Sequence, residues 1–291
     1  MPAWAIDLEH RLATRTETAT DLLWLNPGRI MAQSGLTPDP WQREVLESPA
    51  RRVLLLCSRQ AGKSRTAAAL ALKTALLEPP AEVLIISRAL RQSAELLRKV
   101  RELYRGLQQA RPRRPPPFRP VPLRQLDAAD VCLGPGEQVV QQSVLQMELA
   151  NGSRILSLPG SPDTIVGFSA ISLLVIDEAA RVPDELYRAV RPMLAVSGGK
   201  LVCLSSAYAQ QGFFYHEWTQ GAASWQRIRV TAQECPRISP EFLAEELAAM
   251  GRRIFDREYG CQFTGVDDAA FDPGTVARAL SAPAGAEAPL F

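Results

Sequence analysis

The sequence lacks any apolar run long enough to cross a bilayer, and its first ten residues carry neither a charged leader nor a hydrophobic signal core. We therefore expect no membrane association and a cytoplasmic location. Its five cysteines lack metal-ligand spacing, which argues against a zinc framework and indicates reduced core residues. The formal net charge of +2 is too small for a protein that coats nucleic acid by bulk electrostatics.

What the 291 residues do contain is enough apolar content, 46%, for one large α/β domain with at most a small appendage. No internal repeat is visible. Strand-like and helix-like segments alternate, which predicts a mainly parallel central sheet flanked by helices. We expect strands at residues 52–57, 82–87, 172–176, 201–205 and 226–230, helices at 63–77, 90–107 and 240–250, and a hairpin of 144–149 with 154–158 around Asn151-Gly152.

A phosphate-binding loop follows the first strand. The consensus loop opens with glycine, whereas this one reads Cys57, four residues, then Gly62-Lys63-Ser64. Such a loop holds a triphosphate through backbone N–H groups at a helix N-terminus. In this interpretation Gly62 lets the backbone approach, Lys63 reaches the β- and γ-phosphates, and the Ser64 hydroxyl binds Mg²⁺. Because of the departure at Cys57, a chance match at a helix start stays open until a second motif agrees.

The second motif lies downstream, where the apolar run 172–176 ends in Asp177-Glu178. This pattern is typical of a buried parallel strand with a Walker B tip. Asp177 is expected to hold Mg²⁺, and Glu178 to orient and activate the water that attacks the γ-phosphate. A solvated strand end is the alternative for this motif alone. With the phosphate loop before it, the pair predicts a P-loop nucleotide triphosphatase.

Basic residues outnumber acids between Arg88 and Arg124. The first half reads as an amphipathic helix whose outer arginines alternate with Glu95 and Glu102, so a solvated, salt-bridged face is the alternative to phosphate binding. The second half, residues 111–120, is an arginine-bearing proline arm that cannot be helical. It either touches DNA or only links elements.

Further segments complete a resemblance to a known family. They are Trp41-Gln42, Ser58-Arg59-Gln60-Ala61-Gly62-Lys63-Ser64, Ile176-Asp177-Glu178-Ala179-Ala180, Ser205-Ser206-Ala207 and Asp256-Arg257-Glu258-Tyr259-Gly260-Cys261-Gln262-Phe263. Together they resemble the ATPase domain of phage terminase large subunits over residues 36–271. Phosphate loops with an Arg-Gln pair and no leading glycine are usual in that family.

The resemblance implies a RecA/ASCE-like P-loop NTPase fold with a small C-terminal lid or linker subdomain. It divides the chain into an N-terminal helical segment at 1–35, the ATPase core at 36–230, the lid or linker at 231–271 and a flexible tail at 272–291. No residues after Phe271 match the acidic strand motifs of the family's nuclease domain. We therefore expect ATP hydrolysis, and no nuclease activity, from this chain.

The resemblance also assigns roles to residues. Gln42 pairs with the adenine edge beside Trp41, with a capped helix start as the alternative. Arg59 acts catalytically with Lys63 and Glu178 by reaching the γ-phosphate or switching toward another subdomain, or else forms a structural salt bridge. Ser205-Ser206-Ala207 couples hydrolysis to movement, with a polar strand tip as the alternative. The expected nucleotide-binding residues are Trp41, Gln42, Ser58, Arg59, Gln60, Ala61, Gly62, Lys63, Ser64 and Arg65, and the metal ligands are Ser64 and Asp177.

One expected residue is missing. Related ATPases carry an arginine before the glycine of the loop that precedes Walker B, and it acts on the neighbouring subunit's nucleotide. The matching position here is Val166, before Gly167. A ring that relies on this arginine is then either impaired or uses another arginine, such as Arg154 or Arg181.

The function implied is an ATP-driven motor, with Mg²⁺·ATP as cofactor, that moves double-stranded DNA into a viral capsid. Its expected partners are DNA, the portal protein, the small terminase subunit and further copies of itself in a ring, with a monomer in isolation. The expected location is the host cytoplasm, with transient attachment to the procapsid portal. A helicase-like translocase and a nucleotide-binding module without turnover are the alternatives.

Overall fold

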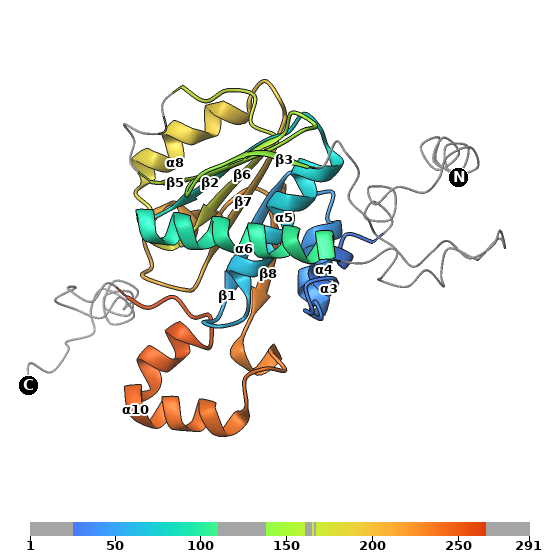
Figure 1. The fold of residues 1–291 in the computed structure, drawn as a ribbon. Coiled ribbons are helices and arrows are strands. Elements are labelled where there is room, and N and C mark those ends of the chain that lie inside the picture. Colours follow the sequence, from blue (N-terminus) through green and yellow to red (C-terminus); the bar gives the residue numbers. More distant parts are fainter. Residues whose placement is uncertain (1–25, 110–137, 161–164, 166, 266–291) are drawn as a thin grey trace, which may run out of the picture.

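A computed structural model describes residues 26–109, 138–160, 165 and 167–265 of the chain. Its centre is an eight-stranded sheet with the order β3-β4-β5-β2-β6-β7-β1-β8 (Figure 1). Six neighbouring strands, from β5 to β8 in that order, run parallel, and β3 and β4 add an antiparallel edge. The strands are β1 (Arg52–Cys57), β2 (Glu82–Ser87), β3 (Val139–Gln142), β4 (Gln146–Leu149), β5 (Arg154–Pro159), β6 (Leu173–Asp177), β7 (Lys200–Ser205) and β8 (Gln226–Val230).

Helices cover both faces of this sheet. They are α3 (Arg29–Ala32), α4 (Pro40–Glu47), α5 (Lys63–Leu77), α6 (Leu90–Gln109), α8 (Asp184–Val190), α9 (Gly212–Thr219) and α10 (Pro240–Glu258), with 3₁₀ turns η4 (Ala179–Arg181), η5 (Arg191–Leu194) and η6 (Ala232–Glu234). In Figure 1, α5 and α6 cross one face and α8 lies on the other. This two-sided cover explains why the central strands read as continuous apolar runs.

Alternate residues of each strand feed two separate cores. Val53 and Leu55 of β1 pack with the apolar sides of α3 to α6, whereas Leu54 and Leu56 pack with α8, η5 and α9. The helix α5 is alanine-rich and buried almost all round, which lets it lie close to the sheet between β1 and α6. The position of α5 matters for the site, because its first turn faces the carboxyl end of β1.

A third, smaller core belongs to the C-terminal segment. Ala232, Leu243, Phe255 and Tyr259 form it below the sheet, where α10 lies in Figure 1. The helix α10 begins with Ser239, whose hydroxyl accepts the Phe242 N–H at 3.2 Å. It bends at Gly251, which has φ 75° and ψ 162°, values open to glycine but costly for other residues.

Most elements match the sequence-based prediction, and two do not. The strands β1, β2 and β8 and the helix α5 have the predicted bounds, and β4 and β5 form the predicted hairpin. The predicted helix 240–250 ends where the non-helical Gly251 interrupts α10, and the helical stretch that continues beyond this kink to Glu258 was not predicted. The edge strand β3 was not predicted, since its residues alternate poorly and are mostly exposed.

Several predictions fall outside the described residues. These are the N-terminal segment up to residue 25, the proline arm at 111–120, the tail at 272–291, Cys132 and Val166. Within the described part, Cys57, Cys203, Cys235 and Cys261 are buried free thiols, as predicted. None of the helices described there is long and apolar enough to cross a membrane.

Gly199 tests how closely the sheet is packed at its amino-terminal edge. A Cβ at this position would lie 2.0 Å from the carbonyl oxygen of Ile171 and 2.8 Å from that of Ser172. These are backbone atoms, so Gly199→Ala must displace the start of β7 from β6. We expect a loss of about 1–3 kcal/mol in the free energy of unfolding, measured by urea denaturation. Gly28→Ala is the control, since its new methyl meets only side-chain atoms, and equal midpoints for the two variants would contradict this packing.

Candidate active site

The phosphate loop joins the end of β1 to the start of α5. Gly62 caps α5 with φ 101°, and Gln60 also has a positive φ of 61°. A Cβ at Gly62 would lie 2.9 Å from Nε2 of Gln42, so both conformation and space require glycine there. The first N–H groups of a helix have no partners within it. The loop therefore presents donors and the positive end of the α5 dipole to an anion.

Two acidic residues lie near this loop at the carboxyl end of β6, which is separated from β1 in the sheet by β7. β6 ends at Asp177, which is 6% exposed, and Glu178 follows with φ 53° and ψ 40°. A left-handed conformation is unusual for glutamate and is typical of strained functional positions. It places the Glu178 carboxylate 3.6 Å from Nζ of Lys63. The structure thus brings together the two residues that the sequence motifs assigned to one reaction.

Asp177 is the most perturbed acid of the site. Burial, and secondarily the charge of Glu178, raise its pKa to about 6, while Lys63 acts in the opposite direction. Its Oδ1 accepts the N–H of Glu178 at 3.0 Å. A buried carboxylate with a cation beside it is suited to receive a further positive charge.

The donor chemistry fits Mg²⁺. Asp177 and Ser64 offer a carboxylate and a hydroxyl, which are hard oxygen donors. No cluster of three or more His, Cys, Asp or Glu side chains that could hold a metal occurs in the described residues. This agrees with a magnesium ion that takes few protein ligands and completes its shell with phosphate oxygens and water.

The side chains of Gln42 and Trp41 form hydrogen bonds at the start of α4. The N–H of Asp39 donates to Oε1 of Gln42 at 2.9 Å, and Nε2 of Gln42 donates to the Thr66 hydroxyl at 2.9 Å. Gln42 is 2% exposed, and Nε1 of Trp41 donates to Asp39 at 3.3 Å. The capped helix start is therefore what the structure contains. Adenine pairing by Gln42 would require these hydrogen bonds to break, and it stays a prediction.

Arg59 points out of the loop toward the C-terminal segment. Its Nε forms a salt bridge with the buried carboxylate of Glu258, and its backbone N–H donates to the Glu258 carbonyl at 2.9 Å. The hydrogen bond to Glu258 raises the pKa of Arg59 further. Of the roles considered for Arg59, the salt bridge is the one this structure contains. Arg65 is likewise turned away from the loop, to Glu102 of α6 at 2.8 Å.

A second contact between the loop and the C-terminal segment was missed by sequence reasoning. Arg237 donates to both carboxylate oxygens of Asp39 at 2.7 Å and to the Ala61 carbonyl at 3.0 Å. It therefore ties the phosphate loop to the start of α4. No local signal identifies Arg237, because its partners lie far away along the chain and on other elements.

The expected coupling residues follow β7. The Ser205 hydroxyl accepts the N–H of Ala180 at 3.2 Å, which connects this strand tip to the turn after Glu178. Ser206 and Ala207 are buried. Arg181, in the same turn, lies 4.2 Å above the Tyr208 ring, while Arg154 pairs with Glu82 at 2.9 Å at the start of its strand.

Comparisons with known proteins show the family and the fold of the chain. A family model described as "Terminase large subunit, T4likevirus-type, N-terminal" matches residues 54–275. A search of curated proteins gives no match. The fold is similar to that of the large terminase ATPase domain of Thermus phage P74-26, with a TM-score of 0.60 and 18% identity over 80% of this chain and 97% of that one.

Longer terminases are similar over part of their length. The HK97 bacteriophage large terminase matches with a TM-score of 0.57 and 14% identity over 81% of this chain and 55% of that one. The large terminase of a thermophilic bacteriophage in complex with ADP matches with 0.55 and 12% over 78% and 54%. The chain thus spans about half the length of these two proteins.

The raised pKa of Asp177 predicts a stability cost in the metal-free protein. A raised carboxyl pKa means that the folded chain binds the proton more tightly than the unfolded chain. The charged, buried carboxylate therefore lowers the free energy of unfolding by its full amount above pH 6. This loss disappears below pH 3.8, the ordinary pKa of the group, where the carboxyl is protonated in both states. Asp177→Asn should raise the free energy of unfolding at pH 7 by on the order of 2 kcal/mol, with little gain near pH 4.

Urea denaturation of the metal-free and nucleotide-free chain at both pH values measures this difference. Glu185→Gln, which removes an exposed acid of α8, is the matched control and should change stability little at either pH. A destabilised Asp177→Asn variant at pH 7 would show that the carboxylate is compensated in the fold.

Proposed function

This chain belongs to the terminase large subunit family, in its T4-like N-terminal ATPase region, and from this premise we propose that it hydrolyses ATP to drive double-stranded DNA into a viral capsid. The observation that supports hydrolysis most directly is the approach of Lys63 to Glu178 beside the buried Asp177. The carboxylates of Asp177 and Glu178, the ammonium group of Lys63 and the phosphate loop lie together at the carboxyl edge of the sheet. That is the arrangement phosphoryl transfer needs, because catalysis there rests on positioning and charge stabilisation.

Binding would begin at the phosphate loop. Its N–H groups and the α5 N-terminus receive the β- and γ-phosphates, and Lys63 turns from Glu178 toward them. Ser64 and Asp177 would hold Mg²⁺, which neutralises the charge that develops on the phosphate oxygens. Occupancy of the loop by phosphates thus removes the ion pair that neutralises Glu178 in this structure.

Once released from Lys63, Glu178 is free to act as a base. Its carboxylate orients a water molecule and accepts its proton while the water oxygen bonds to the γ-phosphorus. The bond from that phosphorus to the bridging oxygen breaks, and ADP and phosphate are the products. The strained backbone of Glu178 keeps the carboxylate directed at the loop rather than along the strand.

Two contacts are suited to transmit the reaction. The backbone N–H of Ala180, two residues after Glu178, donates a hydrogen bond to the Ser205 hydroxyl at the end of β7. A displacement of Glu178 would therefore be transmitted to the end of β7. Arg59 belongs to the loop but holds Glu258 of the C-terminal segment. A γ-phosphate that attracts Arg59 would break its salt bridge with Glu258 and release this segment. Residues 231–271 would then act as a lid or linker that moves.

The remaining parts of the proposal concern assembly. We place the chain in a homomeric ring in the host cytoplasm, attached transiently to the portal protein and served by the small terminase subunit. Arg181 or Arg154 supplies the arginine that acts on a neighbour's nucleotide. An active site completed by a neighbour makes the isolated chain a slow, monomeric ATPase.

Steady-state ATP hydrolysis, measured across protein concentration with and without double-stranded DNA, tests the proposal. Glu178→Gln removes the base and Lys63→Ala the phosphate contact, and each should lower turnover by about 10²-fold or more. Glu178→Gln should still bind nucleotide, because its side chain is not used for binding. Glu185→Gln, which changes an exposed side chain of α8, is the matched control and should keep full activity.

Turnover that rises with protein concentration supports a site completed by a neighbour. Nucleotide binding by the unaltered chain without turnover at any concentration would favour the binding module instead. Retained turnover in both variants would refute the roles given to Lys63 and Glu178.

A further inference from the structure

Four arginines gather at the edge of the sheet opposite the phosphate loop. Arg51 precedes β1, Arg52 begins it, Arg188 lies in α8 and Arg191 begins η5. They line one cavity of about 510 Å³, and no acidic residue contributes to its lining. We call these four residues the arginine edge. Arg51, Arg188 and Arg191 are exposed to solvent and Arg52 is half-buried.

Aromatic rings hold two of these arginines without neutralising them. The guanidinium carbon of Arg52 lies 5.9 Å from the Trp225 ring centroid, and that of Arg191 lies 5.3 Å from the Tyr187 centroid. Such contacts orient a guanidinium but leave its N–H donors available. Both rings are fixed in turn, because Trp225 and Tyr187 each donate to Glu217 at 2.8 Å.

The other two arginines have only weak partners in the described residues. Arg188 approaches Asp184 at 3.9 Å, and its side chain is 70% exposed, so the pair is loose. Arg51 lies against Gly198, where a Cβ would come within 2.5 Å of its guanidinium nitrogen. Glu217 and Asp184 are the acids that these contacts place beside the arginines, and Glu47 and Glu78 line a neighbouring cavity that Arg51 also lines. No acid lines the cavity that the four arginines share.

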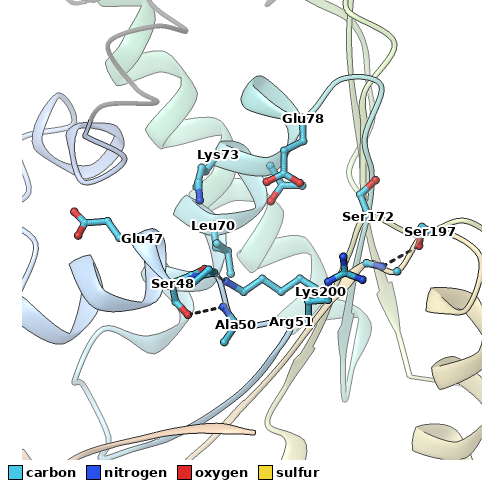
Figure 2. A pocket seen from close by; sticks show the side chains of 14 residues that line it. Glu47, Ser48, Ala50, Arg51, Leu70, Lys73, Glu78, Ser172, Ser197 and Lys200 are labelled. Atoms are coloured by element: carbon cyan, nitrogen blue, oxygen red, sulfur yellow. Dashed lines mark hydrogen bonds between the residues drawn. The ribbon is translucent and has the colours of Figure 1, made fainter. Parts of the chain in front are cut away.

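A second cavity, which Figure 2 shows, is lined by Arg51, Lys73 and Lys200 among others. It shares Arg51, Gly198 and Gly199 with the first cavity. Its lysines are already in use, since Lys73 donates to the Leu46 carbonyl at 2.7 Å and Lys200 to the Ser48 carbonyl at 2.8 Å. These bonds stabilise the carboxyl end of α4. Glu47 and Glu78 also line this cavity. The two lysines of this cavity therefore serve the fold, whereas Arg51, which lines both cavities, belongs to the arginine edge.

We propose that Arg51, Arg52, Arg188 and Arg191 bind the phosphate backbone of duplex DNA. The inference rests on the proposed function, which supplies DNA as the polyanion. Guanidinium forks match phosphate oxygens, and several arginines from different elements suit a repeating row of phosphates read without regard to sequence. The contact is one that DNA can slide along, because every phosphate offers the same oxygens.

The place of the arginine edge suits a motor. β1 runs from Arg52 to Cys57, where the phosphate loop begins, and β7 runs from Lys200 to Ser205. Two neighbouring six-residue strands, each about 20 Å long, therefore join the arginine edge to the nucleotide site. DNA bound at one edge of the sheet and nucleotide at the other would be connected through two neighbouring strands that are mostly buried.

Binding of a labelled DNA duplex to the full chain, followed by fluorescence anisotropy across salt concentration, tests the proposal. In the triple variant Arg51→Gln, Arg188→Gln, Arg191→Gln we expect weaker binding. The slope of log K against log salt should fall by about 0.9 for each lost phosphate contact, or about 2.7 in all. The matched control is Arg43→Gln, Arg91→Gln, Arg105→Gln, which removes the same charge from other exposed arginines and should keep most of the slope.

Two further measurements keep the outcome clear. The triple Arg→Lys variant at the same three edge positions retains charge and should recover most of the slope, and the Gln variant should keep its nucleotide affinity and melting temperature. An unchanged slope in a folded Gln variant, or an equal loss in the control, overturns the proposal. The partner of the arginine edge would then be an acidic protein surface.

The proposed function can fail separately. If the unaltered chain binds duplex with the expected dependence on the arginine edge but never turns over ATP, the inference holds and the motor does not. If turnover depends on Glu178 while the edge variants bind DNA normally, the motor holds and the inference fails.

Discussion

The ion pair between Lys63 and Glu178 is the interaction around which the rest of the site is arranged. Two adjacent acids at a strand tip repel each other, and burial has already raised the pKa of Asp177 to about 6. A single lysine at 3.6 Å from Glu178 limits that cost while the loop is without phosphate. In the proposed mechanism Lys63 turns toward the phosphates and no longer offsets this repulsion, so ligand binding and activation of Glu178 would be one electrostatic event.

The C-terminal segment is attached to this site by contacts of a particular kind. Its own core is small. It reaches the phosphate loop through Arg59–Glu258 and through Arg237, which donates to the Ala61 carbonyl and pairs with Asp39 at the start of α4. In each pair the carboxylate is buried and the guanidinium is about half exposed. Exposed arginines exchange partners at low cost, whereas a buried carboxylate left alone is expensive. A phosphate group can therefore compete for the arginine only if the segment shifts and lets the carboxylate meet water.

The sequence correctly predicted the elements that have a distinctive local residue pattern. β1, the phosphate loop and α5 follow from an apolar run, a glycine and a helix former in succession, and β6 with Asp177 follows from the same logic. Arg237 was beyond that logic, because a salt bridge between residues 39 and 237 leaves no periodicity to read. Gln42 shows the opposite difficulty. Its pattern fits adenine binding and helix capping equally, and only the positions of Asp39 and Thr66 reveal which bonds it makes.

A parallel sheet gives its two edges different chemistry. At the carboxyl edge the strands end beside the α5 N-terminus, where backbone dipoles and Lys63 favour an anion in a closed loop. At the amino edge the positive charge comes from the side chains of the arginine edge, of which Arg52 and Arg191 lie against the Trp225 and Tyr187 rings. The first arrangement suits one compact ligand, while the second suits the extended polyanion that we propose for it. Because a close-packed interior is hardly compressible and transmits strain, a sheet that separates these two proposed tasks between its ends can link them without placing them in competition for the same charges.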